Sequence, residues 1–124
     1  MYERILVGTD GSKTAAKAVD RAVQVASDAG ARLTILSAGR ADRAGEAVQK
    51  EASRHAGAPI AIDIKVVEGE AVAALITEAR DGRYDLLVLG NKGMTGVTRF
   101  FSIGSVPNKV SHHLPCSLLI VKTT

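Results

Sequence analysis

Cysteine, aromatic residues and long apolar segments are all scarce in this sequence of 124 residues. The single cysteine, Cys116, excludes an internal disulfide. Two Phe, two Tyr and no Trp leave few side chains on which single-stranded nucleic acid could stack. No apolar run approaches the roughly 20 residues that span a membrane, and the first residues lead into a strand pattern rather than a signal peptide. We therefore expect a cytoplasmic protein that binds neither membranes nor nucleic acid.

Charge of one sign is not concentrated anywhere in the chain. Sixteen basic and thirteen acidic residues give a formal charge of +3 and are spread along the whole sequence. A nucleic-acid surface needs basic residues clustered on one face or element, so this distribution argues against one. The length and the 46% hydrophobic content suit one core. We expect a single domain over residues 1–124.

Apolar runs of strand length alternate with segments of helical periodicity. This alternation predicts an α/β fold with a parallel sheet, right-handed crossovers and helices on both faces. The period-2 pattern of residues 60–67 is typical of a strand near a sheet edge with one face in water. The predicted strands are residues 4–8, 32–38, 60–67, 84–89 and 117–121, and the predicted helices are residues 13–29, 42–56, 71–80 and 105–113.

Neighbouring residues in the sequence predict the ends of the first helix and the environments of the cysteine and the histidines. Ser12 precedes the helical pattern and is the expected N-cap. Gly30 follows it and is the expected left-handed residue after the helix. Cys116 begins an apolar strand, where a free cysteine usually behaves as a small buried hydrophobe. His55, His112 and His113 lack a ligand spacing and are predicted to be surface or helix-end residues.

A glycine-spaced loop follows the buried strand that stops at Gly90. Glycines let backbone N–H groups converge on a ligand, and a helix starting near Ser105 would add its free N–H groups. The spacing therefore favours a phosphate, although a connector that needs glycine for its turns has the same pattern. It is neither Gly-x-Gly-x-x-Gly nor a P-loop. The candidate residues are Gly90, Asn91, Gly93, Gly104, Ser105 and Val106.

Asp10 directly follows the first buried strand. Its carboxylate could accept a hydrogen bond from a ligand, or it could cap the helix that starts just after it. In parallel α/β sheets, ligands bind outside the carboxyl ends of the strands. Both Asp10 and Gly90 lie at such ends, so these two residues are candidates for one crevice.

The chain resembles the universal stress protein family over its whole length. The resemblance rests on the opening run Ile-Leu-Val-Gly-Thr-Asp-Gly-Ser at residues 5–12, on Gly90-x-x-Gly93 followed by Gly104-Ser105, and on the tail at residues 106–121. Two departures accompany it. Residues 94–103 make the gap between Gly93 and Gly104 one residue longer than is usual in the family, and the chain is short around residues 39–45.

The resemblance implies a Rossmann-like sandwich, similar to adenine nucleotide alpha-hydrolases, with a five-stranded parallel sheet of order 3-2-1-4-5 and about four helices. It also implies binding of ATP with Mg²⁺ by a stress-response regulator with little or no hydrolysis, and a homodimer formed through the last strand, Ser117–Val121. A dimeric interaction module that binds no nucleotide and a slow ATPase remain alternatives. The implied nucleotide residues are Gly8, Thr9, Asp10 and Ala38 together with Gly90, Asn91, Gly93, Gly104, Ser105 and Val106.

Overall fold

The computed structural model describes residues 1–91, 114 and 116–123. They form a five-stranded sheet of order β3-β2-β1-β4-β5 in which every pair of neighbours is parallel. This arrangement confirms the predicted fold and strand order. The elements are β1 (Arg4–Gly8), α1 (Lys13–Ala29), β2 (Arg32–Ala38), α2 (Ala41–Arg54), β3 (Ile62–Val67), α3 (Ala71–Asp81), β4 (Leu86–Gly90) and β5 (Ser117–Val121).

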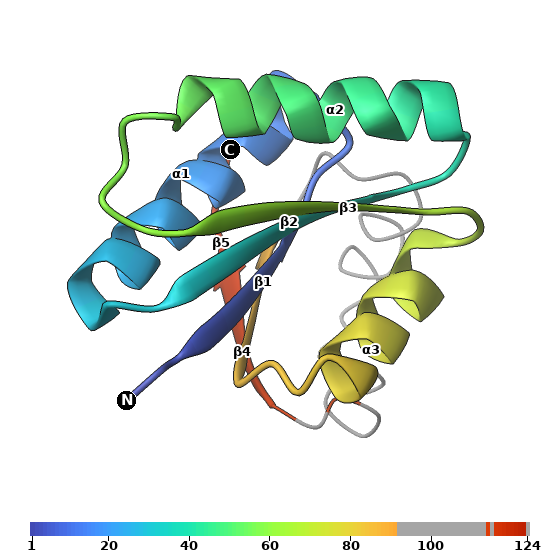
Figure 1. Ribbon diagram of the computed structural model, residues 1–124. Helices are drawn as coiled ribbons and strands as arrows, with labels where there is room; N and C mark the ends of the chain where they lie inside the picture. Colours follow the sequence, from blue (N-terminus) through green and yellow to red (C-terminus); the bar gives the residue numbers. More distant parts are fainter. Residues whose placement is uncertain (92–113, 115, 124) are drawn as a thin grey trace.

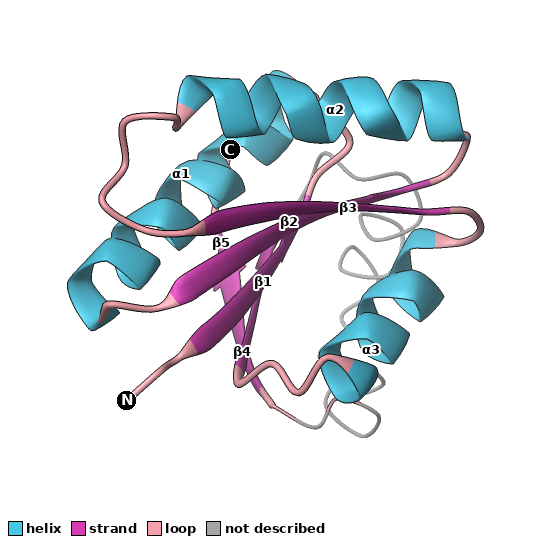
Figure 2. Cartoon of the chain, in the orientation of Figure 1, coloured by secondary structure: helices cyan, strands magenta, loops and turns pink. Residues whose placement is uncertain are grey.

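The sheet separates two apolar layers. Helices α1 and α2 cover one face and α3 covers the other (Figures 1 and 2). On the first face, Val19 of α1 and Val48 of α2 pack with Ile5 and Ile35 of the central strands. On the second face, Leu75 of α3 packs with side chains from β1, β2 and β4. Strands β1, β2 and β4 are buried from both sides. The continuous apolar runs of β1 and β4 predict this burial.

Helix α1 begins and ends where the sequence predicts. The Ser12 Oγ accepts a hydrogen bond from the Ala15 N–H at 3.1 Å, and Gly30 has the left-handed φ of 68°. The buried side of the helix is built from alanines and valines at helical spacing. Small side chains let α1 lie close to β1 and β4, so this helix fixes the position of the first turn of the chain.

Strand β3 is an edge strand, as the period-2 pattern predicts. Its apolar side is less covered than that pattern implies, since Ile64 and Val66 are 39% and 38% exposed. The strand begins at Ile62 rather than at residue 60 because its pairing with β2 starts at Leu33 opposite Ile62. The Ala61 carbonyl still accepts the Leu33 N–H at 3.0 Å, so one ladder hydrogen bond precedes the first residue of the strand.

Helix α2 is held to α1 by a buried carboxylate that sequence analysis did not single out. Glu51 is fully buried, and both of its oxygens accept hydrogen bonds from Arg54, at 2.9 and 2.8 Å. Arg54 also donates to Asp20 of α1 at 2.7 Å. The hydrogen bond to Glu51, followed by the one to Asp20, raises the pKa of Arg54 above its ordinary value. Asp20 additionally contacts His55, the C-cap of α2, at 2.9 Å.

Two smaller predictions can also be compared with the structure. Helix α2 begins one residue earlier and ends two residues earlier than predicted. It ends early because His55 already has a non-helical ψ of 21° and Gly57 and Pro59 follow.

Cys116 is partly buried against the α3-side core, and this burial raises the pKa of its thiol. The predicted fourth helix, residues 105–113, lies outside the described residues. None of the described helices is long and apolar enough to cross a membrane.

Candidate functional site

The carboxyl ends of β1, β2 and β4 meet at one edge of the sheet. The Thr9 N–H, just past β1, donates to the Leu36 carbonyl of β2 at 2.9 Å. On the other side, β1 pairs with β4 through Val7 opposite Val88. The strand order reverses between β1 and β4, because β2 and β3 lie on one side of β1 and β4 and β5 lie on the other. This is the position at which parallel α/β sheets place their ligands.

The turn after β1 is built from short polar side chains. The Thr9 Oγ1 accepts a hydrogen bond from the Gly11 N–H at 3.1 Å, and the Asp10 Oδ1 accepts one from the Ser12 N–H at 2.9 Å. Thr9 is fully buried, whereas Asp10 is exposed. One Asp10 oxygen thus shapes the turn, while Ser12 supplies the N-cap itself. Asp10 is therefore not the N-cap of α1, and its side chain lies at the surface.

The turn after β2 is very short and brings α2 to the same edge. Gly39 has a φ of 127°, which favours glycine, and its N–H donates to the Val67 carbonyl at 3.0 Å. Helix α2 then begins at Ala41. Because the connection is so short, Arg40 and the first-turn residue Arg43 lie beside the end of β2.

A pocket of about 360 Å³ opens at this place. Asp10 from the β1 turn and Ala38 from the end of β2 line it together with Arg40 and Arg43. Ser37, Gly39, Ala44 of α2 and Ala71 at the start of α3 complete the wall. The pocket therefore combines a small apolar wall with one carboxylate and two guanidinium groups. Such a mixture suits a ligand with an apolar ring system and an anionic group.

A second pocket of about 360 Å³ adjoins the first and shares Asp10 and Arg43 with it. Helix α2 comes very close to the β1 turn here, since a Cβ built on Gly11 would lie 3.1 Å from the Ala47 Cβ. The Lys50 ammonium donates to the Gly11 carbonyl at 2.9 Å. Two pockets of about 420 and 450 Å³ also exist, lined from α1 and from the β3–α3 connection, but both lie away from the ends of β1 and β4.

The end of β4 is occupied by the C-terminal tail. The Asn91 N–H donates to the Val121 carbonyl at 3.0 Å, and the Asn91 Oδ1 accepts from both the N–H and the Oγ1 of Thr123, each at 2.9 Å. Thr123 is only 3% exposed. The Lys17 ammonium of α1 donates to the Thr123 carbonyl at 3.0 Å. Asn91 thus anchors the tail across β4 and α1.

The predicted site residues have different positions in the structure. The structure brings Asp10 and Ala38 together in one pocket, about thirty residues apart in sequence. Gly8 and Thr9 are buried and do not line that pocket, and Asn91 holds the tail. Gly90 ends β4 at the same edge of the sheet. Gly93, Gly104, Ser105 and Val106 lie outside the described residues.

Sequence analysis missed Arg40 and Arg43 as pocket residues. Both follow the end of β2, so the rule that selected Asp10 after β1 and Gly90 after β4 also applies to them. The signal was present in the polar segment at residues 39–45, which we considered only as a shortened connection. Its shortness is what moves these two arginines to the pocket. Within the described residues, no three His, Cys, Asp or Glu side chains form a metal site.

The sequence model of the universal stress protein family matches residues 1–48 and 37–122 of the chain. The chain belongs to the universal stress protein family. The two matches overlap at residues 37–48, so the break between them falls at the end of β2 and the first part of α2. This universal stress protein thus departs from its family's pattern at the segment that carries the pocket arginines.

Relatives from several bacteria match the chain along its whole length. A universal stress protein of Mycobacterium tuberculosis is 34% identical over 145 aligned residues, which cover 99% of this chain and 98% of the relative. The universal stress protein YxiE of Bacillus subtilis is 28% identical over 149 residues, covering 98% of this chain and all of the relative. Both alignments are longer than this chain, which agrees with its shortened segment.

Solved structures give the same result for the fold. A universal stress protein crystallised in complex with cAMP is 31% identical, has a TM-score of 0.79 and covers 99% of each chain. The protein Rv1636 of Mycobacterium tuberculosis H37Rv is 38% identical, with a TM-score of 0.69 and coverage of 99% of this chain and 97% of its own.

Proposed function

We propose that this universal stress protein binds an adenine nucleotide, with ATP as its ligand, at the carboxyl ends of β1, β2 and β4. The observation that carries the proposal is the pocket in which Asp10 and Ala38 meet Arg40 and Arg43. A relative 31% identical to this chain and similar over its whole length has been solved with cAMP, an adenine nucleotide. The ligand class of that relative and the lining of this pocket agree.

The parts of a nucleotide can be matched to parts of the pocket. Ala38, Ala44 and Ala71 offer an apolar wall for the base. Asp10 accepts hydrogen bonds, which suits the ribose hydroxyls or the base amine. Arg40 and Arg43 supply planar, permanently charged donors for phosphate oxygens. Gly90, Gly93, Gly104, Ser105 and Val106 remain our predicted phosphate and ribose contacts.

Magnesium would accompany the phosphates of ATP rather than occupy a protein site. Mg²⁺ usually keeps several waters and takes one or two carboxylates together with phosphate oxygens. Asp10 and Glu46 are the carboxylates that line the paired pockets. This donor set fits a nucleotide-borne Mg²⁺. At most, Asp10 or Glu46 would replace one of its waters.

The proposed role is that of a regulator whose state depends on nucleotide occupancy. Phosphoryl transfer needs a well-held metal and a positioned water. The two adjoining pockets offer two carboxylates, Asp10 and Glu46, and Asp10 already accepts the Ser12 N–H. We therefore infer little or no hydrolysis. Nucleotide would shift the protein between forms only as far as it prefers one of them.

We also propose a homodimer formed through β5. This strand pairs with β4 on one side and is the outermost strand of the sheet, and its Ile120 is 37% exposed. An apolar edge strand is a template for a second strand. Sedimentation equilibrium of the parent protein and of an Ile120→Lys variant tests this directly. We expect a dimer that the added charge weakens, whereas a monomeric parent would rule the dimer out.

Isothermal titration with ATP and Mg²⁺ tests the nucleotide proposal. The parent protein is titrated beside Gly93→Val, whose side chain would block approach of the backbone to phosphate. Gly57→Val is the matched control, because a Cβ at Gly57 meets nothing within 4 Å and Gly57 lies after α2, away from the pocket. Titrations with ADP and cAMP rank the ligands.

We expect binding by the parent and by Gly57→Val, and loss of binding by Gly93→Val. Equal binding by all three proteins would remove the glycine loop from the site. No binding of any of the three nucleotides by the parent would favour the interaction module without nucleotide, and a search for a protein partner would follow.

A further inference from the structure

The outer edge of β3 combines exposed apolar side chains with backbone groups that point away from the sheet. The Leu33 N–H donates to the Ala61 carbonyl and the Gly39 N–H donates to the Val67 carbonyl, each at 3.0 Å. Residues 61 and 67 therefore face β2. Since backbone groups alternate in direction along a strand, Ile62, Ile64 and Val66 turn their N–H and C=O groups outward.

The same three residues also share a side-chain face. Ile62 packs against the core cluster that contains Val48 of α2, so the face of Ile62, Ile64 and Val66 is the α2 side of the sheet. Ile64 and Val66 are nevertheless more than one-third exposed. Helix α2 therefore leaves the outer half of this strand uncovered.

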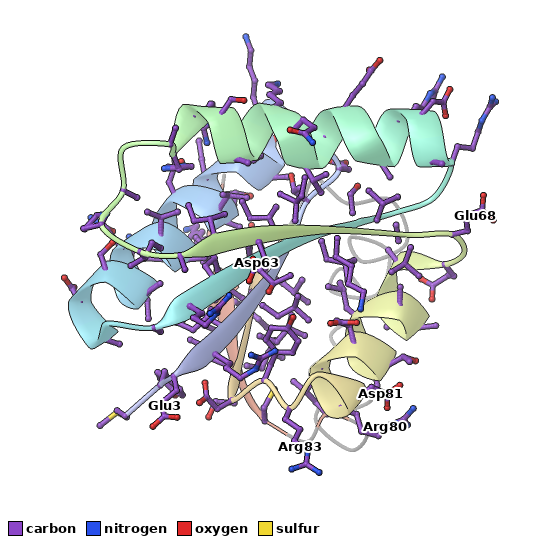
Figure 3. The ribbon with its side chains drawn as sticks, in the orientation of Figure 1. Glu3, Asp63, Glu68, Arg80, Asp81 and Arg83 are labelled. Atoms are coloured by element: carbon purple, nitrogen blue, oxygen red, sulfur yellow. The ribbon has the colours of Figure 1, made fainter. Side chains whose placement is uncertain are left out.

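The opposite face of β3 carries charges of both signs. Asp63 accepts a hydrogen bond from Arg32 at 3.1 Å, and Lys65 donates to Glu78 of α3 at 2.6 Å. Figure 3 shows Asp63 on β3, on the side of the strand away from α2. Asp63 and Lys65 are both more than 45% exposed, at 56% and 49%. An edge strand is often protected by such charges, but here the two signs are placed two residues apart.

We propose that β3 is a self-complementary edge that pairs antiparallel with β3 of a second copy, centred on Ile64. The outward backbone groups require that even-numbered residues face one another across the pair. A two-fold axis at Ile64 places Ile62 opposite the second copy's Val66 and Asp63 opposite the second copy's Lys65. An axis at residue 63 would place Asp63 opposite the second copy's Asp63, and an axis at residue 65 would place Lys65 opposite the second copy's Lys65. The axis at Ile64 is the one that places Asp63 and Lys65 opposite each other.

This register satisfies both faces of the new strand pair. The α2 face joins three exposed or half-buried apolar side chains from each copy into one patch. On the α3 face, the two Asp63–Lys65 pairs lie at non-hydrogen-bonded positions, where opposed side chains approach most closely. The interface is separate from β5, because β3 and β5 are opposite edges of the sheet.

A charge-swap mixture tests the pairing and its register. Asp63→Lys and Lys65→Asp are purified separately, and sedimentation equilibrium is run on each and on an equimolar mixture. Each variant alone opposes like charges twice, whereas the mixed pair opposes a chain with two basic residues to a chain with two acidic ones. We expect the mixture to associate about tenfold more tightly than either variant alone. All of these chains carry Ile120→Lys, so that the proposed β5 contact does not contribute to the association that is measured.

Two controls separate association from folding. The double variant Asp63→Lys/Lys65→Asp restores opposite charges within one chain and should associate as the parent does. Ile64→Pro removes an N–H that points away from β2 and should abolish the pairing while thermal unfolding stays cooperative. A mixture that sediments as the average of its two components, or a folded Ile64→Pro variant that associates as the parent does, would overturn the proposal.

Discussion

The carboxyl ends of β2 and β4 lie at the same edge of one sheet, yet their side chains serve different purposes. At the end of β2, Ala38, Arg40 and Arg43 line an open pocket. At the end of β4, the Asn91 side chain accepts two hydrogen bonds from a buried Thr123. The side chains at the end of β2 are thus candidates for ligand contact, whereas the Asn91 amide oxygen is committed to the fold.

The difference follows from what the chain does next. After β2 the chain turns at Gly39 and enters α2 at once, and Arg43 in the first turn of α2 is exposed beside the pocket. At β4 the returning tail forms the neighbouring strand β5 and ends against Asn91. We expect substitutions at β4 to change stability and substitutions at β2 to change binding.

The largest expected effect is that of Asn91→Ala. Removal of the Oδ1 acceptor leaves the N–H and Oγ1 of buried Thr123 without their partner. We expect the free energy of unfolding to fall by about 2 to 3 kcal/mol, measured by urea denaturation. Asn91→Asp keeps the acceptor and should lose less. Unchanged stability with lost nucleotide binding would show that Asn91 is a ligand residue instead.

Substitution of Arg43 should separate binding from stability. Arg43→Ala removes an exposed guanidinium from both pockets. We expect affinity for ATP to fall about tenfold, or ~1.4 kcal/mol, with the free energy of unfolding within about 0.5 kcal/mol of the parent. Arg21→Ala, an exposed arginine of α1, is the matched control in the same titration. An equal loss in both variants would reduce the effect to overall charge.

The end of β1 lies between these two cases, and Ser12 represents its structural part. Its Oγ accepts the Ala15 N–H at 3.1 Å. Ser12→Ala should lower the free energy of unfolding by about 1 kcal/mol in urea denaturation. Ser27→Ala, within the same helix, should be neutral or slightly stabilising because alanine is the better helix former. Equal effects at both positions would mean that the cap contributes nothing measurable.

The smallest effect concerns the pocket wall. Ala38 is half-buried and lines the pocket, and Ala38→Val would add two methyl groups there. Partial burial of those groups against the base should raise affinity about twofold to threefold in the titration, well below the ~0.8 kcal/mol of each fully buried methylene. A fall in affinity would mean that Ala38 already contacts the ligand and that the larger valine side chain clashes with it.

Elements with strong local signals could be predicted from the sequence. Helix α1 has a cap at Ser12, a stop at Gly30 and a continuous apolar stripe, and its bounds are confirmed. Strands β1 and β4 were predicted from their buried apolar runs. The bounds of β1 are confirmed, whereas β4 spans Leu86–Gly90 rather than residues 84–89. The start of β3 was predicted two residues too early. The first residue of β3 depends on its pairing with Leu33 of β2, and the local sequence does not reveal this pairing.

The site could be predicted only where position in the fold decides the role. Asp10 was selected by the rule that ligands bind at strand carboxyl ends, and Ala38 by the resemblance to the family. The structure brings both residues into one pocket. Asn91 was assigned to the nucleotide because its partner Thr123 is thirty-two residues away, and this pairing is visible only in the folded chain. Arg40 and Arg43 were missed because their position depends on how early α2 begins. The role of the buried Glu51 was missed for a similar reason. Glu51 binds Arg54, which also donates to Asp20 of α1, and this link between helices is visible only in the folded chain.

The central claim is that nucleotide binds at the carboxyl ends of β1, β2 and β4, in the pocket that Asp10 and Ala38 line, and amide chemical-shift mapping tests it most directly. A ¹⁵N-labelled sample titrated with ATP and Mg²⁺ should show its largest shifts at Asp10, Ala38, Gly39 and Arg43. Residues just before the amino-terminal ends of β1 and β4, such as Glu3 and Asp85, should be unaffected. Saturable shifts confined to those amino-terminal ends, or no shifts at all, would contradict the account.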